Sequence, residues 1–205
     1  MRKNYQLLLD ETIKNISDMG AKPKLLLHAC CAPCSSYVLE YLNVYFDITL
    51  FFYNPNIAPE SEYSFRAEEL RRLADEMPIE RKPEIVVCDY DSEPFYNMAK
   101  DLENLPEGGN RCFLCYELRL KRAAEYAKNN GYDYFCTTLS ISPYKNAEKL
   151  NEIGESLSKE YGVKYLFSDF KKKNGYKRSI ELSKEYNLYR QNYCGCEFSR
   201  RDCEK

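Results

Sequence analysis

The chain has 205 residues, of which 44 % are hydrophobic and 30 % are charged, and its formal net charge is −2 at pH 7. A chain of this size and composition can bury a sizeable core, which argues against intrinsic disorder. The N-terminal residues mix apolar and charged side chains, a pattern that predicts an amphipathic helix over about residues 4–19 rather than a signal peptide or a membrane span. We therefore expect one cytoplasmic domain over residues 1–205.

Short apolar runs alternate with longer amphipathic segments along the chain. The apolar runs predict strands at Lys24–Ala29, Asp47–Phe52, Glu84–Cys88, Asp133–Cys136 and Val163–Phe167. The amphipathic segments predict helices near Ser35–Leu42, Glu60–Glu76, Cys112–Asn129 and Asn146–Tyr161. This order indicates an α/β fold with a mainly parallel sheet of about five strands, helices on both faces and ligands at the carboxyl ends of the strands.

Ten cysteines are the unusual feature of the composition. Without an export signal, structural disulfides explain them poorly, whereas metal sites or catalytic redox pairs explain them well. Cys88, Cys136 and Cys203 have no partner at a meaningful spacing. The others fall in three groups.

The first group follows the first predicted strand, in the stretch LLLHACCAPCS, which holds Cys30, Cys31 and Cys34. A phosphate-binding loop here would contain glycines, and this stretch has none. Cys31 and Cys34 have the spacing of a thioredoxin-like redox pair, in which Cys30 would have no part. His28, the only histidine of the chain, is either a buried side chain that tethers the loop or a proton donor.

The second group, Cys112 and Cys115, stands at the start of a predicted helix in the stretch RCFLCYELRL. Two thiolates at this spacing can bind one metal, and the amino terminus of a helix favours their negative charge. In zinc sites of four cysteines, the two cysteine pairs usually lie closer together in the sequence than Cys34 and Cys112 do. The fold would therefore have to bring the two pairs together. Zinc and an iron–sulfur cluster both remain compatible with these residues.

The third group, Cys194 and Cys196, flanks Gly195. A disulfide between residues two apart needs a tight turn, which glycine permits, and strained disulfides are easily reduced. The pair is interpreted as a redox relay, with two further metal ligands as the alternative.

A basic stretch follows the fifth predicted strand. Residues 164–205 hold 11 Lys and Arg against 6 Asp and Glu, a local charge of +5 in a chain that is otherwise acidic. Within it stand Lys171, Lys172, Lys173, Lys177 and Arg178. These cations either solvate a loop or contact phosphates, and the parallel sheet would place them at the same edge as the cysteines.

Five blocks in order resemble the cobalamin-independent epoxyqueuosine reductase family, QueH. They are LLLHACCAPCS, FYNPNIAPESEYSFR, LPEGGNRCFLCYELRL, TTLSISPYKN and DFKKKNGYKRSIELSKEYNLYRQNYCGCEFS. The resemblance runs from about Leu25 to Ser199. It implies an oxidoreductase that completes queuosine biosynthesis: two electrons remove the epoxide oxygen from epoxyqueuosine in the anticodon loop of tRNA. It also implies a HUP-like, adenine-nucleotide α-hydrolase-like, three-layer fold.

The resemblance further implies cofactors and their residues. A 4Fe–4S cluster would be held by Cys30, Cys31, Cys112 and Cys115, and Cys194 with Cys196 would form a redox-active disulfide. A second, mononuclear iron is associated with the family, and Cys34, Asp89 and Asp91 are its candidate ligands here. A cluster passes one electron at a time, and the sequence leaves open whether the second comes from the dithiol, the extra iron or an external donor. Independently of the resemblance, we expect the five cations of the basic C-terminal segment, about residues 169–205, to contact tRNA phosphates.

Two other functions share parts of this pattern. An iron–sulfur tRNA-thiolation-like enzyme would need a glycine- and serine-rich loop after the first strand, where this chain has CCAPCS. A non-catalytic, zinc-stabilised RNA-binding module would explain the cysteines and the basic stretch, but not the pair Cys194 and Cys196.

Overall fold

The structure is a computed structural model that describes residues 3–20 and 22–203. Its elements in chain order are α1 (Tyr5–Met19), β1 (Lys24–His28), α2 (Ala32–Leu42), β2 (Asp47–Phe52), α3 (Glu60–Glu76), β3 (Glu84–Val87), α4 (Glu93–Ala99), α5 (Asn110–Asn129), β4 (Tyr134–Thr137), the 3₁₀ helix η1 (Thr138–Ile141), α6 (Ala147–Tyr161), β5 (Lys164–Tyr165), α7 (Gly175–Glu185) and α8 (Glu197–Cys203).

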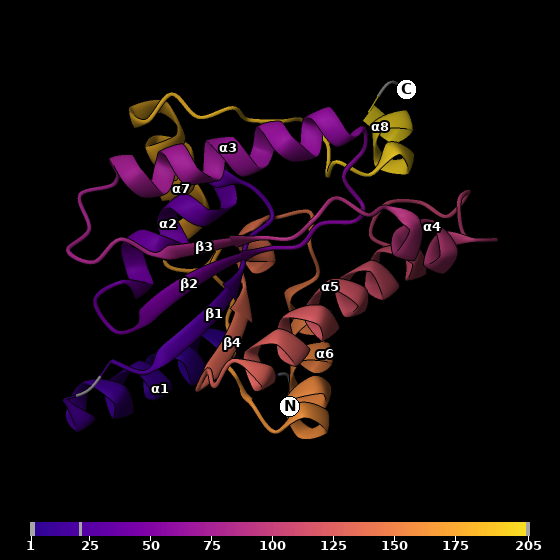
Figure 1. The fold of residues 1–205 in the computed structure, drawn as a ribbon. Coiled ribbons are helices and arrows are strands. Elements are labelled where there is room, and N and C mark those ends of the chain that lie inside the picture. The colour runs from indigo at the N-terminus through magenta and orange to yellow at the C-terminus, as the bar shows by residue number, and fades with distance from the viewer. Residues whose placement is uncertain (1–2, 21, 204–205) are drawn as a thin grey trace.

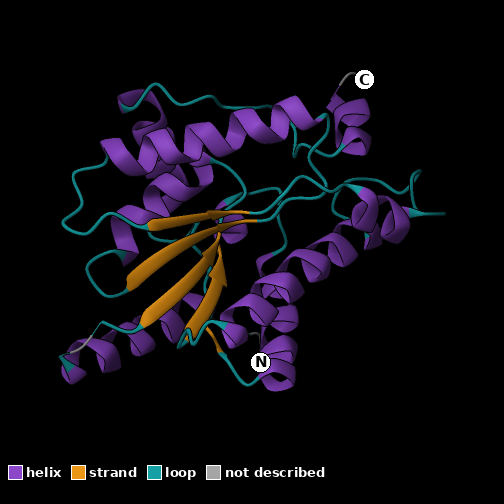
Figure 2. Cartoon of the chain, in the orientation of Figure 1, coloured by secondary structure: helices purple, strands orange, loops and turns teal. Residues whose placement is uncertain are grey.

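The five strands form one parallel sheet in the order β3-β2-β1-β4-β5 (Figure 2). The order changes direction between β1 and β4, and in such sheets the crevice at the carboxyl ends of these two strands is the usual ligand site. Cys30 and Cys31 follow β1 after one residue, Ala29, and Thr138 directly follows β4. The first cysteine group therefore lies at this crevice.

Helices cover both faces of the sheet, as the alternation of strands and helices predicts. Leu25 and Leu27 of β1 face a core that includes residues of α1, α2 and α3, whereas Leu26 faces a second core with residues of α5 and α6. In Figure 1 the sheet lies between α2 and α3 on one side and α5 and α6 on the other, and α7 packs against α2. The prediction of a three-layer α/β fold with a parallel sheet is confirmed.

The structure refines several predicted boundaries. The N-terminal helix is α1, whose first turn is capped by Asn4, because the side chain of Asn4 accepts hydrogen bonds from the backbone N–H groups of Gln6 and Leu7. Helix α2 begins at Ala32, three residues before the prediction, so Cys34 lies in its first turn. Strand β5 is shorter than predicted, and α4, α7 and α8 were not predicted. In the described part of the chain, no helix is long and apolar enough to span a membrane.

Candidate metal and redox site

His28 tethers the loop that carries the first cysteine group. Its buried ring donates from Nε2 to the carbonyl of Tyr53 at 3.1 Å, so Nδ1 is left to accept from the hydroxyl of Thr137 at 2.9 Å. Burial, together with the charge of Arg119, lowers the pKa of His28 to about 3. A neutral ring with both nitrogens in use favours the tether over the proton donor.

Cys30, Cys31 and Cys34 form one cluster of thiols. Their sulfur atoms all lie within 4.8 Å of one another, and those of Cys30 and Cys31 are 3.8 Å apart. Hydrogen bonds from Cys30 and Cys34, helped by the charge of Arg66, hold the pKa of Cys31 well below its usual range, while the pKa values of Cys30 and Cys34 are raised by the same contacts. This cluster, the first thiol cluster, is a set of soft ligands for one metal centre.

Cys112 and Cys115 lie in the first two turns of α5, as predicted. The sulfur of Cys112 accepts a hydrogen bond from the backbone N–H of Gly108 at 3.3 Å. Cys115 is buried, and burial raises its pKa to about 12. The two residues stand one helical turn apart, so both sulfurs can face the same side of α5.

The backbone around Gly195 is held against the loop before α3 and against α3 itself. The backbone N–H of Ala58 donates to the carbonyl of Gly195 at 3.0 Å, and Gly195 has a φ of +100°. Both Cys194 and Cys196 are free thiols. Burial opposes ionisation of Cys194, but the cations Lys145 and Arg119 outweigh it, so its pKa is lowered; burial raises the pKa of Cys196.

Two cavities bring the three groups together. The first, called here the cysteine cavity, has a volume of about 430 Å³ and is lined by the first thiol cluster and Cys194. The second is much smaller and is lined by Cys112, Cys115, Cys194 and Cys196. Cys194, Glu107, Arg119 and Lys145 line both cavities. The structure thus places the two predicted ligand pairs in adjoining cavities with Cys194 between them.

The other residues predicted for a second iron lie elsewhere. Asp89 and Asp91 are exposed and line neither cavity, and Asp91 accepts a hydrogen bond from the backbone N–H of Glu93 at the start of α4. Of the three candidate ligands, only Cys34 lies with the other thiols.

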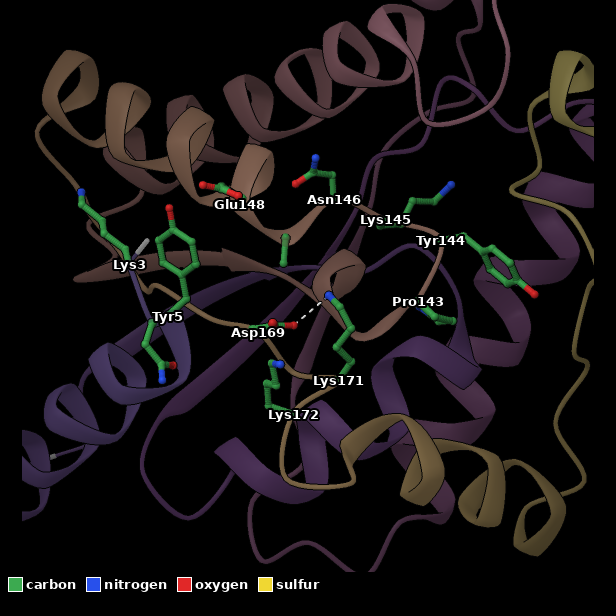
Figure 3. Close-up of a pocket in the computed structure, with 12 residues that line it drawn as sticks. Lys3, Tyr5, Pro143, Tyr144, Lys145, Asn146, Glu148, Asp169, Lys171 and Lys172 are labelled. Atoms are coloured by element: carbon green, nitrogen blue, oxygen red, sulfur yellow. Dashed lines mark ion pairs between the residues drawn. The ribbon is translucent and has the colours of Figure 1, made fainter. Parts of the chain in front are cut away.

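Three of the five predicted phosphate-contacting cations already have acidic partners. Lys171 pairs with Asp169 at 2.8 Å (Figure 3), and Lys173 pairs with Asp10 at 2.7 Å. Arg178 binds both carboxylate oxygens of Glu40. Lys172 is exposed and lines a third cavity, described below; Lys177 belongs to the same stretch, in the first turn of α7.

Sequence reasoning did not assign four buried cations to the site. Arg66, Arg111, Arg119 and Lys145 line the two thiol cavities and are 2 %, 1 %, 1 % and 8 % exposed. Lys145 pairs with Glu107 at 2.8 Å. Burial alone would lower the pKa of Lys145, but Cys194 and its other neighbours outweigh this effect and raise it. The only sequence signal for Arg119 is its position four residues after Cys115, which places both on one face of α5.

Comparison with known proteins identifies a family. A sequence profile described as "Epoxyqueuosine reductase QueH" matches residues 25–202. The chain is 46 % identical over 200 residues to the epoxyqueuosine reductase QueH of Staphylococcus epidermidis, covering 96 % of this chain and 84 % of that protein. It is 41 % identical over 198 residues to that of Streptococcus pyogenes, covering 96 % and 78 %, and 39 % identical over 178 residues to that of Thermotoga maritima, covering 85 % and 89 %.

Proposed function

The chain belongs to the epoxyqueuosine reductase QueH family, and we propose that it works in the cytoplasm, where it removes the epoxide oxygen from epoxyqueuosine in the anticodon loop of tRNA. The reaction consumes two electrons and two protons, breaks both carbon–oxygen bonds of the epoxide, and leaves an alkene and water. The observation that carries the proposal is the gathering of thiols at the switch point of the sheet. Seven cysteines from three distant segments line two adjoining cavities.

Cys30, Cys31, Cys112 and Cys115 would hold a 4Fe–4S cluster. The donor set fits, because all four donors are sulfurs and the single histidine of the chain has both ring nitrogens engaged elsewhere. When bound, such a cluster supplies electrons one at a time. Cys34 lies within 4.8 Å of Cys30 and Cys31 and is the residue best placed to bind a second iron beside it.

Arg119 supports a negatively charged group at this place. Among the described residues, its acceptors are the carbonyl of Cys115 at 3.2 Å and the amide oxygen of Asn54 at 3.5 Å, and its Nη2 has no hydrogen-bond partner. Burial alone would lower the pKa of Arg119, but neighbouring sulfurs, those of Cys115 and Cys194 first, raise it. A buried guanidinium without a carboxylate is costly, and thiolates bound to iron would balance its charge.

Cys194 and Cys196 would store two electrons as a dithiol and release them on forming a disulfide. Cys194 lines the cysteine cavity, and Lys145 and Arg119 favour its thiolate form, which is the form that takes part in thiol–disulfide exchange. Cys196 is buried against Phe95 and Phe198. An external reductant would restore the dithiol after each turnover.

The tRNA would approach the open side of the cysteine cavity. The rim includes Tyr144, Tyr176, Arg190 and Tyr193, side chains that suit an unpaired nucleotide. The phosphates would be contacted by the five cations of the basic stretch, Lys171, Lys172, Lys173, Lys177 and Arg178. Lys172 is exposed, lines a cavity and takes no part in the ion pairs described above.

One assay tests this function directly. The protein, purified and loaded with iron and sulfide without oxygen, is incubated with epoxyqueuosine-containing tRNA and a low-potential reductant, and the nucleosides are measured by mass spectrometry. We expect conversion of epoxyqueuosine to queuosine at a loss of one oxygen atom. A brown, iron-loaded protein that leaves epoxyqueuosine unchanged would contradict the reductase, and a colourless protein with stoichiometric zinc would favour the non-catalytic RNA-binding module.

A further inference from the structure

Tyr144 presents an aromatic ring to solvent at the edge of the site. Its side chain is 76 % exposed, more than any other large hydrophobic side chain in the described part of the chain. Its flanking residues differ in exposure: Pro143 is also exposed, whereas Lys145 is buried, at 8 %. An isolated exposed aromatic is common on protein surfaces, so the position and support of this ring have to carry the argument.

The loop beneath Tyr144 is firmly held. The backbone N–H of Tyr144 donates to the hydroxyl of Ser142 at 3.3 Å, and that of Lys145 donates to the carbonyl of Ser142 at 3.2 Å. The buried ammonium of Lys145 is fixed by Glu107, and the side chain of Asn146 caps the start of α6. The backbone under the ring is therefore set in advance, which lowers the entropy lost when a ligand stacks on it.

Tyr144 also stands on the wall between two cavities. One is the cysteine cavity. The other, called here the lysine groove, has a volume of about 630 Å³ and is lined by Lys3, Tyr5, Asp169, Lys171 and Lys172 among others. Pro143, Tyr144 and Lys145 line both. Figure 3 shows Tyr144 at one end of the lysine groove, with Lys3 and Tyr5 at the other and Lys171 and Lys172 between them.

We propose that Tyr144 stacks on an unpaired RNA base next to the nucleotide that enters the cysteine cavity, and that the sugar–phosphate chain of this neighbour follows the lysine groove past Lys172. The inference rests on the proposed function, because it takes the substrate to be a nucleotide in an RNA loop. A rigid aromatic ring beside a groove with basic side chains is the arrangement that binds single-stranded nucleic acid. A double-stranded segment offers no free base face and would gain nothing from the ring.

The test uses the iron-loaded full chain, and its probe is an anticodon stem–loop RNA that carries unmodified guanosine, so that binding is measured without turnover. Replacing Tyr144 with Leu removes the ring, and we expect affinity to fall by roughly 5- to 150-fold, the range that follows from the loss of one base–aromatic stack. Tyr144→Phe keeps the ring and should bind like the wild type. The matched control is Tyr161→Leu, at the far end of α6, which should also bind like the wild type.

Two further measurements separate stacking from other roles. The salt dependence of binding should keep its slope in Tyr144→Leu, because stacking releases no counterions, and binding of a fully paired RNA hairpin stem should not change. Wild-type affinity in Tyr144→Leu, or an equal loss in Tyr144→Phe, would overturn the inference. Reduction of epoxyqueuosine-tRNA by the wild-type protein is measured in a separate assay. A failure of the reductase function shows in that assay, whereas a failure of the stacking contact shows only in the binding of the Tyr144 variants.

Discussion

Arg66 of α3 donates a hydrogen bond from Nη1 to the main-chain carbonyl of Cys194, 3.3 Å away and 128 residues later in the chain. The same buried guanidinium binds Glu62 and lies 5.3 Å from the centre of the Tyr193 ring. Its charge also favours the thiolate of Cys31. One side chain thus fixes the segment that carries Cys194 and faces the first thiol cluster.

Replacing Arg66 with Met should release this segment. The variant loses the bond to Cys194 and leaves Glu62 without its partner, which should destabilise the fold by about 1.5–3 kcal/mol, as measured by urea unfolding. Peptide mass mapping after iodoacetamide treatment should show faster labelling of Cys194 in the iron-free protein. Arg71→Met, an exposed change on the same helix, is the control and should leave both measurements unchanged. Unchanged labelling in Arg66→Met would mean that Arg66 does not hold the segment.

Gly195 should not tolerate a side chain. Its φ of +100° disfavours any residue with a Cβ, and a Cβ here would lie 2.9 Å from Cγ1 of Ile57 and 3.0 Å from Nη1 of Arg66. We expect Gly195→Ala to reduce turnover of epoxyqueuosine-tRNA by at least tenfold. In Gly131→Ala the φ is also positive, at +68°, but no atom lies within 4 Å of the new Cβ. That control should lose about 1–2 kcal/mol of stability and keep its turnover. Equal turnover in the two variants would argue against a close fit at Gly195.

The fold was predictable because its signals are local. The buried strands β1 and β2 are continuous apolar runs, and the alternation of strands and helices fixes a parallel sheet. Helix α7 was missed because its start has no ordinary cap: Asn174 has a φ of +63° and makes no side-chain cap hydrogen bond. Gly175 is needed because a Cβ would lie 2.0 Å from the carbonyl oxygen of Phe170 and 2.4 Å from the ring of Tyr37. The contact with Tyr37 joins segments far apart in the sequence, so no local sequence pattern predicts it.

The candidate site was predictable only in part, for the same reason. The spacing of the cysteines and the resemblance to a family predicted the thiols of the site. Charged residues normally lie on the surface, so nothing in the sequence marked Arg66 or Arg119 as buried. The ion pairs Lys173 with Asp10 and Arg178 with Glu40 connect α7 and the residues before it to α1 and α2. Whether a basic residue is available for phosphate thus depends on tertiary neighbours.

Cys112→Ala should remove the cluster. If Cys112 is one of four ligands, its loss should lower bound iron and sulfide together and abolish reduction of epoxyqueuosine-tRNA. Cys88→Ala is the matched control, because Cys88 is a half-buried cysteine at the end of β3 that lines neither thiol cavity, and it should keep its iron. Iron content equal to that of the wild type in Cys112→Ala would remove this residue from the ligand set.

Cys196→Ser should separate the redox pair from the cluster. Serine has nearly the same size and cannot form a disulfide, so turnover with a dithiol reductant should be lost while the visible absorption and iron content stay close to those of the wild type. Cys136→Ser is the comparison, a buried cysteine of β4 in a different part of the core, which should keep its turnover if it folds. Loss of iron in Cys196→Ser would instead make Cys196 a metal ligand.

Lys172 should account for more of the salt dependence of tRNA binding than its neighbours. Lys171 and Lys173 already pair with Asp169 and Asp10, so each must give up a carboxylate before it can neutralise a phosphate, whereas Lys172 is exposed on the wall of the lysine groove. Each phosphate contact contributes about 0.7–0.9 to the slope of log affinity against log salt concentration. We therefore expect Lys172→Gln to lower that slope by about this amount, and Lys173→Gln to change it by less.

Lys159→Gln, on an exposed turn at the far end of α6, should leave the slope unchanged. Equal slopes in the wild type and Lys172→Gln, measured with the same tRNA, would show that the phosphates do not follow this groove. The docking surface would then be sought at other residues that line the cysteine cavity, Arg190 and Tyr193.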